Sequence, residues 1–73
     1  MTRVAAMGET AKVESFALAG ALVFPADVAH DVDAAWDALP DDVGVLIVTP
    51  AAAVRLHARF DERPQLLTVV SPE

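Results

Sequence analysis

One uncharged stretch, residues 43–48, constrains the fold of this chain more than any other. It reads VGVLIV, and it lies between the acidic pair Asp41-Asp42 and the pair Thr49-Pro50. A short aliphatic run without polar alternation is typical of a strand that is buried on both faces. Thr49 is suited to cap a helix, and Pro50 is suited to its first position. The stretch therefore predicts a strand followed at once by a helix, as in an open parallel sheet.

The residues before this strand predict two more strands, each with its own helix. Residues 2–7 are expected to form the first strand, with a helix as the alternative because the segment is short and rich in alanine. Residues 11–19 are expected to form the first helix, with apolar side chains at helical spacing. Residues 21–24 predict a second strand. Residues 27–40 predict a second helix between a capping aspartate and a terminating proline. The strand–helix unit is therefore repeated along the chain.

Glycines and short polar residues mark the boundaries of these elements. Gly8 breaks the first strand, and Thr10 is expected to cap the first helix. Gly20 is expected to end that helix in a left-handed conformation. Asp27 is expected to cap the second helix. These positions predict short connections between neighbouring elements.

The rest of the chain completes an alternating pattern of strands and helices. Residues 50–62 predict a third helix, and residues 66–70 a fourth strand. This alternation indicates a parallel sheet with helices on both faces, and right-handed crossovers favour the strand order 2-1-3-4. The predicted fold class is α/β, a small flavodoxin-like open parallel four-stranded sheet. Residues 1–73 are expected to form this single domain.

Each helix has an apolar side that is expected to face the sheet. These inward positions are Val13, Phe16 and Ala17 in the first helix, Val28, Val32, Ala35, Trp36 and Leu39 in the second, and Ala53, Leu56 and Phe60 in the third. Trp36 is expected in the core, with an interface anchor as the alternative. Arg55 and Arg59 lie on the outer side of the third helix, as exposed charges or as a small docking patch.

In this topology half of one sheet face has no covering helix. The first helix covers one face, and the second and third helices cover the other. We therefore expect bare apolar surface beneath the third and fourth strands, and an unprotected edge at the fourth. The hydrophobic fraction of 55% also favours a covered surface, by a partner or by self-association into a homo-oligomer. The expected partner-binding residues are Leu66, Val69 and Val70.

The charge and composition exclude several classes of partner. The net charge of −6, with five basic residues against eleven acidic ones, disfavours binding to nucleic acid or anionic membranes. The longest uncharged run, residues 16–26, is much shorter than the roughly 20 residues that span a bilayer, so direct membrane insertion is not expected. Glu9 and Lys12 interrupt the apolar stretch after Arg3, which argues against a cleaved signal peptide. There is no cysteine for a disulfide or a thiolate metal site.

An acidic run surrounds the second helix and leads into the central strand. It consists of Asp31, Asp33, Asp37, Asp41 and Asp42. Such a run is expected to be a solvated face, and the alternative is electrostatic docking onto a basic partner.

The sequence offers little reaction chemistry. In doubly wound folds ligands bind beyond the carboxyl ends of the strands, where the strand order reverses, and this places Glu9, Thr10 and Thr49 near one another. We expect a solvated turn and two helix caps, with a small-ligand site as the alternative. No glycine-rich nucleotide motif is present, and His30 and His57 lack the spaced partners of a metal site. We therefore expect no catalytic residue, no cofactor and no metal, and hence no enzyme.

Four short motifs together resemble a family of small central-stalk subunits, designated F, of the V-type and archaeal A-type rotary ATPases, or ATP synthases. They are Gly8-Glu9 after the first strand, then Phe16, Leu18, Ala19 and Gly20 in a Gly-Phe-x-Leu-Ala-Gly pattern, then residues 41–49 as an acidic-to-aliphatic third strand, and residues 64–72 as a proline-flanked fourth strand. Ser15 stands where the second motif has its first glycine. The motifs follow the family order and span essentially the whole chain.

The resemblance implies a non-catalytic subunit of the central stalk, or rotor. Such a subunit binds the coiled-coil shaft of the rotor and contributes to ATP-driven transport of protons or sodium ions, or to ATP synthesis. It would be cytoplasmic and peripheral to a membrane complex. Family members usually continue past the fourth strand into a C-terminal helix, whereas this sequence stops at Glu73, so the resemblance is to a short form that lacks this helix.

Overall fold

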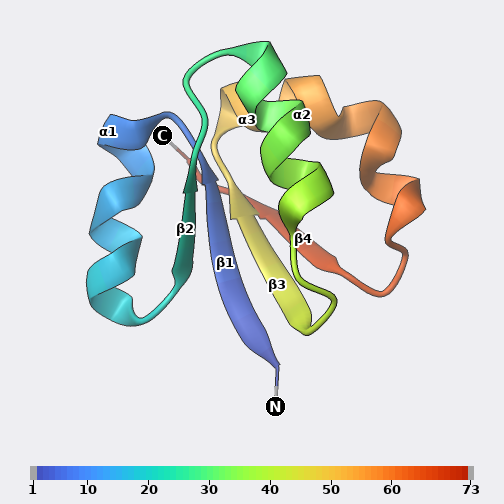
Figure 1. Ribbon diagram of the computed structural model, residues 1–73, viewed down its shortest axis with the longest axis horizontal. Coiled ribbons are helices and arrows are strands. Elements are labelled where there is room, and N and C mark those ends of the chain that lie inside the picture. Colours follow the sequence, from blue (N-terminus) through green and yellow to red (C-terminus); the bar gives the residue numbers. More distant parts are fainter. Residues whose placement is uncertain (1, 73) are drawn as a thin grey trace.

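Four parallel strands form the centre of the molecule in the computed structural model, which describes residues 2–72 (Figure 1). In chain order the elements are β1 (Arg3–Gly8), α1 (Thr10–Val13), the 3-10 helix η1 (Glu14–Ala19), β2 (Leu22–Pro25), α2 (Ala29–Ala38), β3 (Val43–Val48), α3 (Pro50–Leu56), the 3-10 helix η2 (His57–Glu62) and β4 (Leu67–Val70). The strand order is β2-β1-β3-β4. The predicted α/β class, parallel pairing and strand order are confirmed.

The central strand β3 owes its position to its lack of polar side chains. It pairs with β1 on one side and with β4 on the other. Leu46 and Val48 are fully buried, and Val43 is nearly so. Val45 and Ile47, which point to the other face, are only half-buried, so the prediction of burial on both faces is confirmed for the face towards α2 and α3 and is wrong for the other. The aliphatic run nevertheless occupies an interior position of the sheet, with a strand on each side.

The main core lies between the sheet and the pair α2 and α3. Its buried members are Ala5, Met7, Ala26, Val32, Trp36, Leu39, Val43, Leu46, Val48, Ala52 and Leu56. Trp36 is 1% exposed, which confirms its predicted place in the core. On the other face α1 and η1 lie beside β2, as the left side of Figure 1 shows. Helices thus lie on both faces of the sheet, as predicted.

The first and third helices differ from the continuous α-helices that the hydrophobic spacing predicts. After one α-helical turn or two, each tightens into a 3-10 helix, at Glu14 and at His57 respectively. A 3-10 helix has about 3.0 residues per turn instead of 3.6, so later side chains rotate away from the predicted face. This explains why Ala17, predicted to face inward, is exposed.

One predicted core residue of the second helix is also exposed. Val28 is 58% exposed, because it precedes α2 in an extended conformation and does not occupy the helical face. Val32, Trp36 and Leu39, by contrast, are buried as predicted.

Two of the predicted helix caps are confirmed and two are wrong. Gly20 ends η1 with a φ of 89°, and the Thr49 hydroxyl accepts a hydrogen bond from the Ala52 N–H at the start of α3. Thr10, however, lies inside α1, and its N–H and hydroxyl donate to the Asp27 carboxylate at 3.0 and 2.6 Å. Asp27 therefore holds the start of α1 and does not cap α2. The loops after β1 and β2 meet because these strands are neighbours, and the Ala26 N–H donates to the Gly8 carbonyl.

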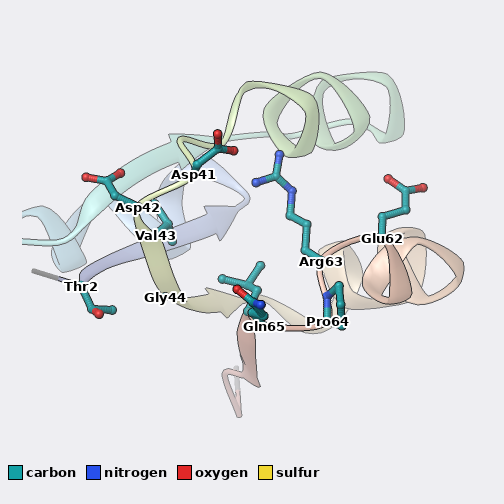
Figure 2. A pocket seen from close by; sticks show the side chains of 10 residues that line it. Thr2, Asp41, Asp42, Val43, Gly44, Glu62, Arg63, Pro64 and Gln65 are labelled. Carbon is teal, nitrogen blue, oxygen red and sulfur yellow. The ribbon is translucent and has the colours of Figure 1, made fainter.

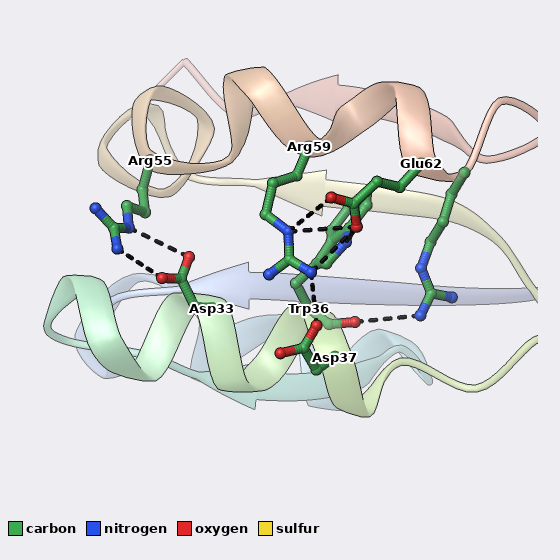
Figure 3. Close-up of polar contacts among 7 residues, drawn as sticks. Asp33, Trp36, Asp37, Arg55, Arg59 and Glu62 are labelled. Atoms are coloured by element: carbon green, nitrogen blue, oxygen red, sulfur yellow. Dashed lines mark hydrogen bonds and ion pairs between the residues drawn. The ribbon is translucent and has the colours of Figure 1, made fainter.

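Ion pairs join α2 to α3 and η2 along their outer sides (Figure 3). Arg55 forms a two-point contact with Asp33, and Arg59 contacts both Asp37 and Glu62 at 2.6 and 3.1 Å. Hydrogen bonds to Arg55 and Arg59 hold the pKa values of the Asp33 and Glu62 carboxyls below their usual range. The two arginines, predicted to be exposed charges or a docking patch, are occupied within the fold.

Candidate protein-binding face of the sheet

One half of one sheet face, the half formed by β3 and β4, has no helix of residues 2–72 over it. It is on the same side of the sheet as α1 and η1. These two helical segments contact β1 and β2, and no helix among residues 2–72 lies over β3 and β4 on that side (Figure 1). The predicted bare half of one face is therefore present in the structure.

Five aliphatic side chains form this surface, which we call the open face. Registered partners in a parallel sheet point to the same side, and the register aligns Val4 with Val45, Val45 with Leu67, and Ile47 with Val69. The open face is therefore Val4, Val45, Ile47, Leu67 and Val69. Leu67 is 60% exposed, Val69 44% and Val4 39%, while the other two are half-buried. Clustered aliphatic side chains in water are a typical feature of a protein–protein interface.

The three residues predicted to bind a partner lie in three different environments. Val69 lies on the open face. Leu66 precedes β4 and packs against the main core. Val70 is 52% exposed, but it is registered with the core residue Val48 and so belongs to the opposite face. Sequence reasoning missed Leu67, although it lies two residues from Val69 and shares its face by strand alternation.

A groove lies beside the open face, between η1 and the strands β1 and β3. Phe16, Ala19 and Gly20 line its η1 side, and Val4 and Ile47 line its floor, around a volume of about 370 Å³. Thr2 and Arg3 also line this groove, which therefore combines an apolar floor with polar side chains.

Polar side chains gather at the other candidate position, beyond the carboxyl ends of β1 and β3. The Thr49 hydroxyl donates to Glu9 Oε1 at 2.5 Å, and Lys12 pairs with the second oxygen of Glu9 at 3.3 Å. The Thr49 hydrogen bond, above all, holds the pKa of the Glu9 carboxyl below its usual range. Thr10 is directed instead to Asp27. The groups that sequence analysis assigned to a small-ligand site are therefore engaged with one another or with the loop after β2.

Replacing Thr49 with valine is expected to raise the pKa of Glu9 towards the ordinary glutamate range. A carboxyl whose pKa is lower in the folded state than in the unfolded state stabilises the protein fully at pH values above the unfolded pKa. This contribution is lost as the pH falls through the folded pKa. The stability difference between the natural protein and Thr49→Val should therefore shrink in acid. A carboxyl-carbon NMR titration measures the pKa directly. Thr49→Ser keeps the hydroxyl and serves as the control, and a Glu9 pKa equal in all three proteins would contradict the assignment.

A second hollow lies at the opposite, amino ends of β3 and β4 (Figure 2). Asp41, Asp42 and Glu62 line it together with Arg63, whose guanidinium donates to the Trp36 carbonyl at 3.2 Å. Parallel sheets place ligand sites at the carboxyl ends of their strands, so this hollow lies at the wrong edge for that role. Within residues 2–72, no three histidine or acidic side chains are grouped so that they could hold a metal ion.

Comparisons with known proteins add no assignment. Neither the scan against protein-family models nor the search of curated proteins finds a match. Between residues 2 and 72, the structure has no helix of the length and hydrophobicity needed to cross a membrane.

Proposed function

We propose that this protein is a non-catalytic binding domain whose open face receives an amphipathic helix of a partner protein. The single observation that carries the proposal is the open face itself, five aliphatic side chains on a half-sheet that no helix of the described residues, 2–72, covers. Removal of apolar surface from water is the dominant favourable contribution to most protein–protein association.

The width of the open face matches one helix. Neighbouring strands lie about 4.8 Å apart, so β3 and β4 together present a floor about 10 Å wide. An α-helix with its side chains is about 10–12 Å in diameter. The groove beside Phe16 and Gly20 would bound this helix on one side, as η1 already occupies the neighbouring half of the same face.

The charge of the protein indicates the chemistry of the partner helix. With a net charge of −6, the domain attracts a basic partner and repels an acidic one. The open face carries no charge of its own, so the partner helix should contact it with leucine, isoleucine or valine at helical spacing. Lysine and arginine should flank that stripe.

The resemblance to the small stalk subunits of rotary ATPases supplies a specific partner of this kind. In that reading the helix belongs to the coiled-coil shaft protein of a V- or A-type rotary ATPase, and the domain is a subunit of the central stalk. It would contribute to ATP-driven ion transport or to ATP synthesis without catalytic residues or a cofactor of its own. The one-helix width of the open face supports this assignment, and it requires a shaft helix with an apolar stripe outside its own a and d positions, which the coiled coil buries.

The test is binding of the purified protein to the coiled-coil shaft protein, with light scattering for the mass of the complex and titration calorimetry for the Kd. Leu67→Lys places an ammonium group on the open face and should raise the Kd at least about tenfold, because burying an unpaired charge costs more than about 1.4 kcal/mol. Val54→Lys makes the matched change on α3, where Val54 is 80% exposed, and should leave the Kd unchanged.

The two parts of the proposal can fail separately. If the shaft protein does not bind at all, the stalk assignment is wrong. If the shaft protein binds the natural protein and Leu67→Lys equally well, the open face is not the binding site. Methyl NMR of the complex gives an independent readout, since the signals of Ile47, Leu67 and Val69 should shift more than that of Val54.

A further inference from the structure

The outer edge of β4 carries backbone groups that point away from the sheet. β4 is the last strand in the order β2-β1-β3-β4, and it pairs with β3 alone. The Ser71 N–H donates to the Val48 carbonyl at 2.7 Å and so faces β3. Backbone direction alternates along a strand, so the groups of Leu67 and Val69 also face β3. The N–H and carbonyl groups of Thr68 and Val70 therefore point outward.

This edge lacks the usual protection against pairing. Natural edge strands commonly carry a lysine, a proline or another charge that prevents the addition of a further strand. Residues 64–72 contain no charged residue, and their two prolines lie outside β4. Exposed side chains on both faces of the strand, Leu67 and Val69 on one and Val70 on the other, add apolar surface next to the edge.

We propose that β4 pairs with β4 of a second copy of this chain, antiparallel, about a two-fold axis that passes beside Val69. The outward groups of Thr68 and Val70 determine this register. With Val69 on the axis, Thr68 lies opposite Val70 of the partner subunit, and Val70 opposite Thr68 of the partner subunit. Each of these two facing pairs exchanges two backbone hydrogen bonds, so the edge forms four.

The edge of β4 is self-complementary in this register, which is what a two-fold interface between two copies requires. Facing residues in an antiparallel pair must point to the same side, and here Val69 meets Val69 of the partner subunit on the side of the open face. A centre at Thr68 would also require outward groups at Leu66, whose N–H already donates to the Arg63 carbonyl, and a centre at Val70 would place Thr68 opposite Pro72 of the partner subunit, which has no N–H. The net charge of −6 on each copy opposes association, but none of this charge lies on the paired strands.

The small contact area sets the expected strength of the dimer. A stable interface buries about 800 Å² on each partner. The whole domain exposes 4482 Å², and β4, with 4 residues, supplies only a small part of that surface. We therefore expect a weak dimer, with a Kd on the order of 10–100 µM. The axis is perpendicular to the sheet, so both open faces lie on the same side of the dimer and remain uncovered. Helix binding uses side chains and dimerisation uses backbone groups, and the two can be tested independently.

The test is sedimentation equilibrium of the natural protein, Val70→Pro and Val70→Ala over about 5–500 µM, a range chosen to bracket the expected Kd. Proline removes the outward N–H of residue 70 and is tolerated at an edge position that does not donate to β3. Val70→Ala removes the same side chain but keeps the N–H. We expect dimers for the natural protein and Val70→Ala, with Kd values within about threefold, and at least tenfold weaker association for Val70→Pro.

Other results would overturn the inference. A natural protein that stays monomeric throughout this range, or a Val70→Pro variant that dimerises as well as Val70→Ala, contradicts pairing at this edge. Amide hydrogen exchange of the natural protein gives a readout that does not depend on folding of the proline variant. The Thr68 and Val70 amides should be protected at 500 µM and exposed at 5 µM. Val70→Pro should bind the coiled-coil shaft protein as well as the natural protein does, whereas Leu67→Lys should bind it at least about tenfold more weakly, so failure here and failure of the proposed function are distinguishable.

Discussion

Replacing Trp36 with alanine is expected to destabilise the protein by about 3–5 kcal/mol, the usual cost of removing a large buried aromatic side chain. Trp36 is the largest of the fully buried side chains, at 1% exposure. It packs against Phe60 with ring centroids 5.8 Å apart, and its indole N–H donates to Glu62. It is therefore the point at which α2, η2 and the sheet are joined.

The size of the domain makes this loss severe. A chain of 73 residues has a total stability of about 4–11 kcal/mol, at 0.05–0.15 kcal/mol per residue. The alanine variant should therefore lose from about a quarter of its stability to all of it, depending on where the total lies in this range. Urea unfolding followed by circular dichroism at 222 nm measures the effect, since the variant no longer has a tryptophan signal.

Two controls separate the ring from its surroundings. Trp36→Phe keeps an aromatic ring against Phe60 but removes the N–H that donates to Glu62, so it should cost clearly less than alanine. Val54→Ala, on an 80% exposed side chain of α3, should cost less than about 0.5 kcal/mol. A loss below about 1 kcal/mol in Trp36→Ala would mean that Trp36 does not hold the core together.

The strand order and the central strand could be predicted because the signals for them are local. The predicted bounds of the central strand, residues 43–48, are those of β3 in the structure. An uninterrupted aliphatic run between an acidic pair and Thr49-Pro50 has few alternatives, and short connections with right-handed crossovers leave a few strand orders, of which 2-1-3-4 was the favoured one. Here the burial pattern and the capping residues pointed to the same answer.

The 3-10 segments could not be predicted from spacing. Val13 and Phe16 are three residues apart, which suits an α-helix and a 3-10 helix equally well. The position of Ala17 would have distinguished them, but alanine is tolerated on either side of a helix. Leu18 is 94% exposed, so hydrophobicity alone is a poor guide to the inner face of this segment.

The composition of the open face depends on register, which a single sequence does not show. The bare half-face followed from topology alone, but its residues required the frame of β4 and its alignment with β3 and β1. The predicted fourth strand began at residue 66, whereas β4 begins at Leu67. The predicted surface therefore included Leu66 and omitted Leu67. Val4 could be identified only once β1 was aligned with β3, since it is distant in sequence from the other members.

The contact between Thr10 and Asp27 shows a further limit of local reasoning. Each residue has the chemistry of a helix cap, and each was assigned to the helix that follows it in sequence. The structure joins them across 17 positions, because β1 and β2 are neighbours and the loops after both strands meet. A cap supplied by another loop satisfies the same donors, and only the packing of the strands decides which cap forms.

Replacing Gly8 with alanine is expected to destabilise the protein by about 2–4 kcal/mol, from backbone strain, a clash and a weakened cap. Gly8 has a φ of 154°, and a Cβ there would clash with the buried side chain of Thr49. Thr49 would have to move away from both Glu9 and the α3 N-terminus that it caps. Thermal and urea unfolding measure the loss.

Gly20→Ala and a double-mutant cycle separate the clash from the backbone term. Gly20 has a φ of 89° with no atom within 4 Å of an added Cβ, so its replacement should cost only about 1 kcal/mol. Thr49→Ala removes the atoms that crowd Gly8. The double variant Gly8→Ala/Thr49→Ala should therefore lose less stability than the two single variants combined, because neighbouring sites that share a clash are not additive. Strict additivity would mean that Gly8 is needed for its backbone conformation alone and that the close approach of β1 to Thr49 contributes nothing.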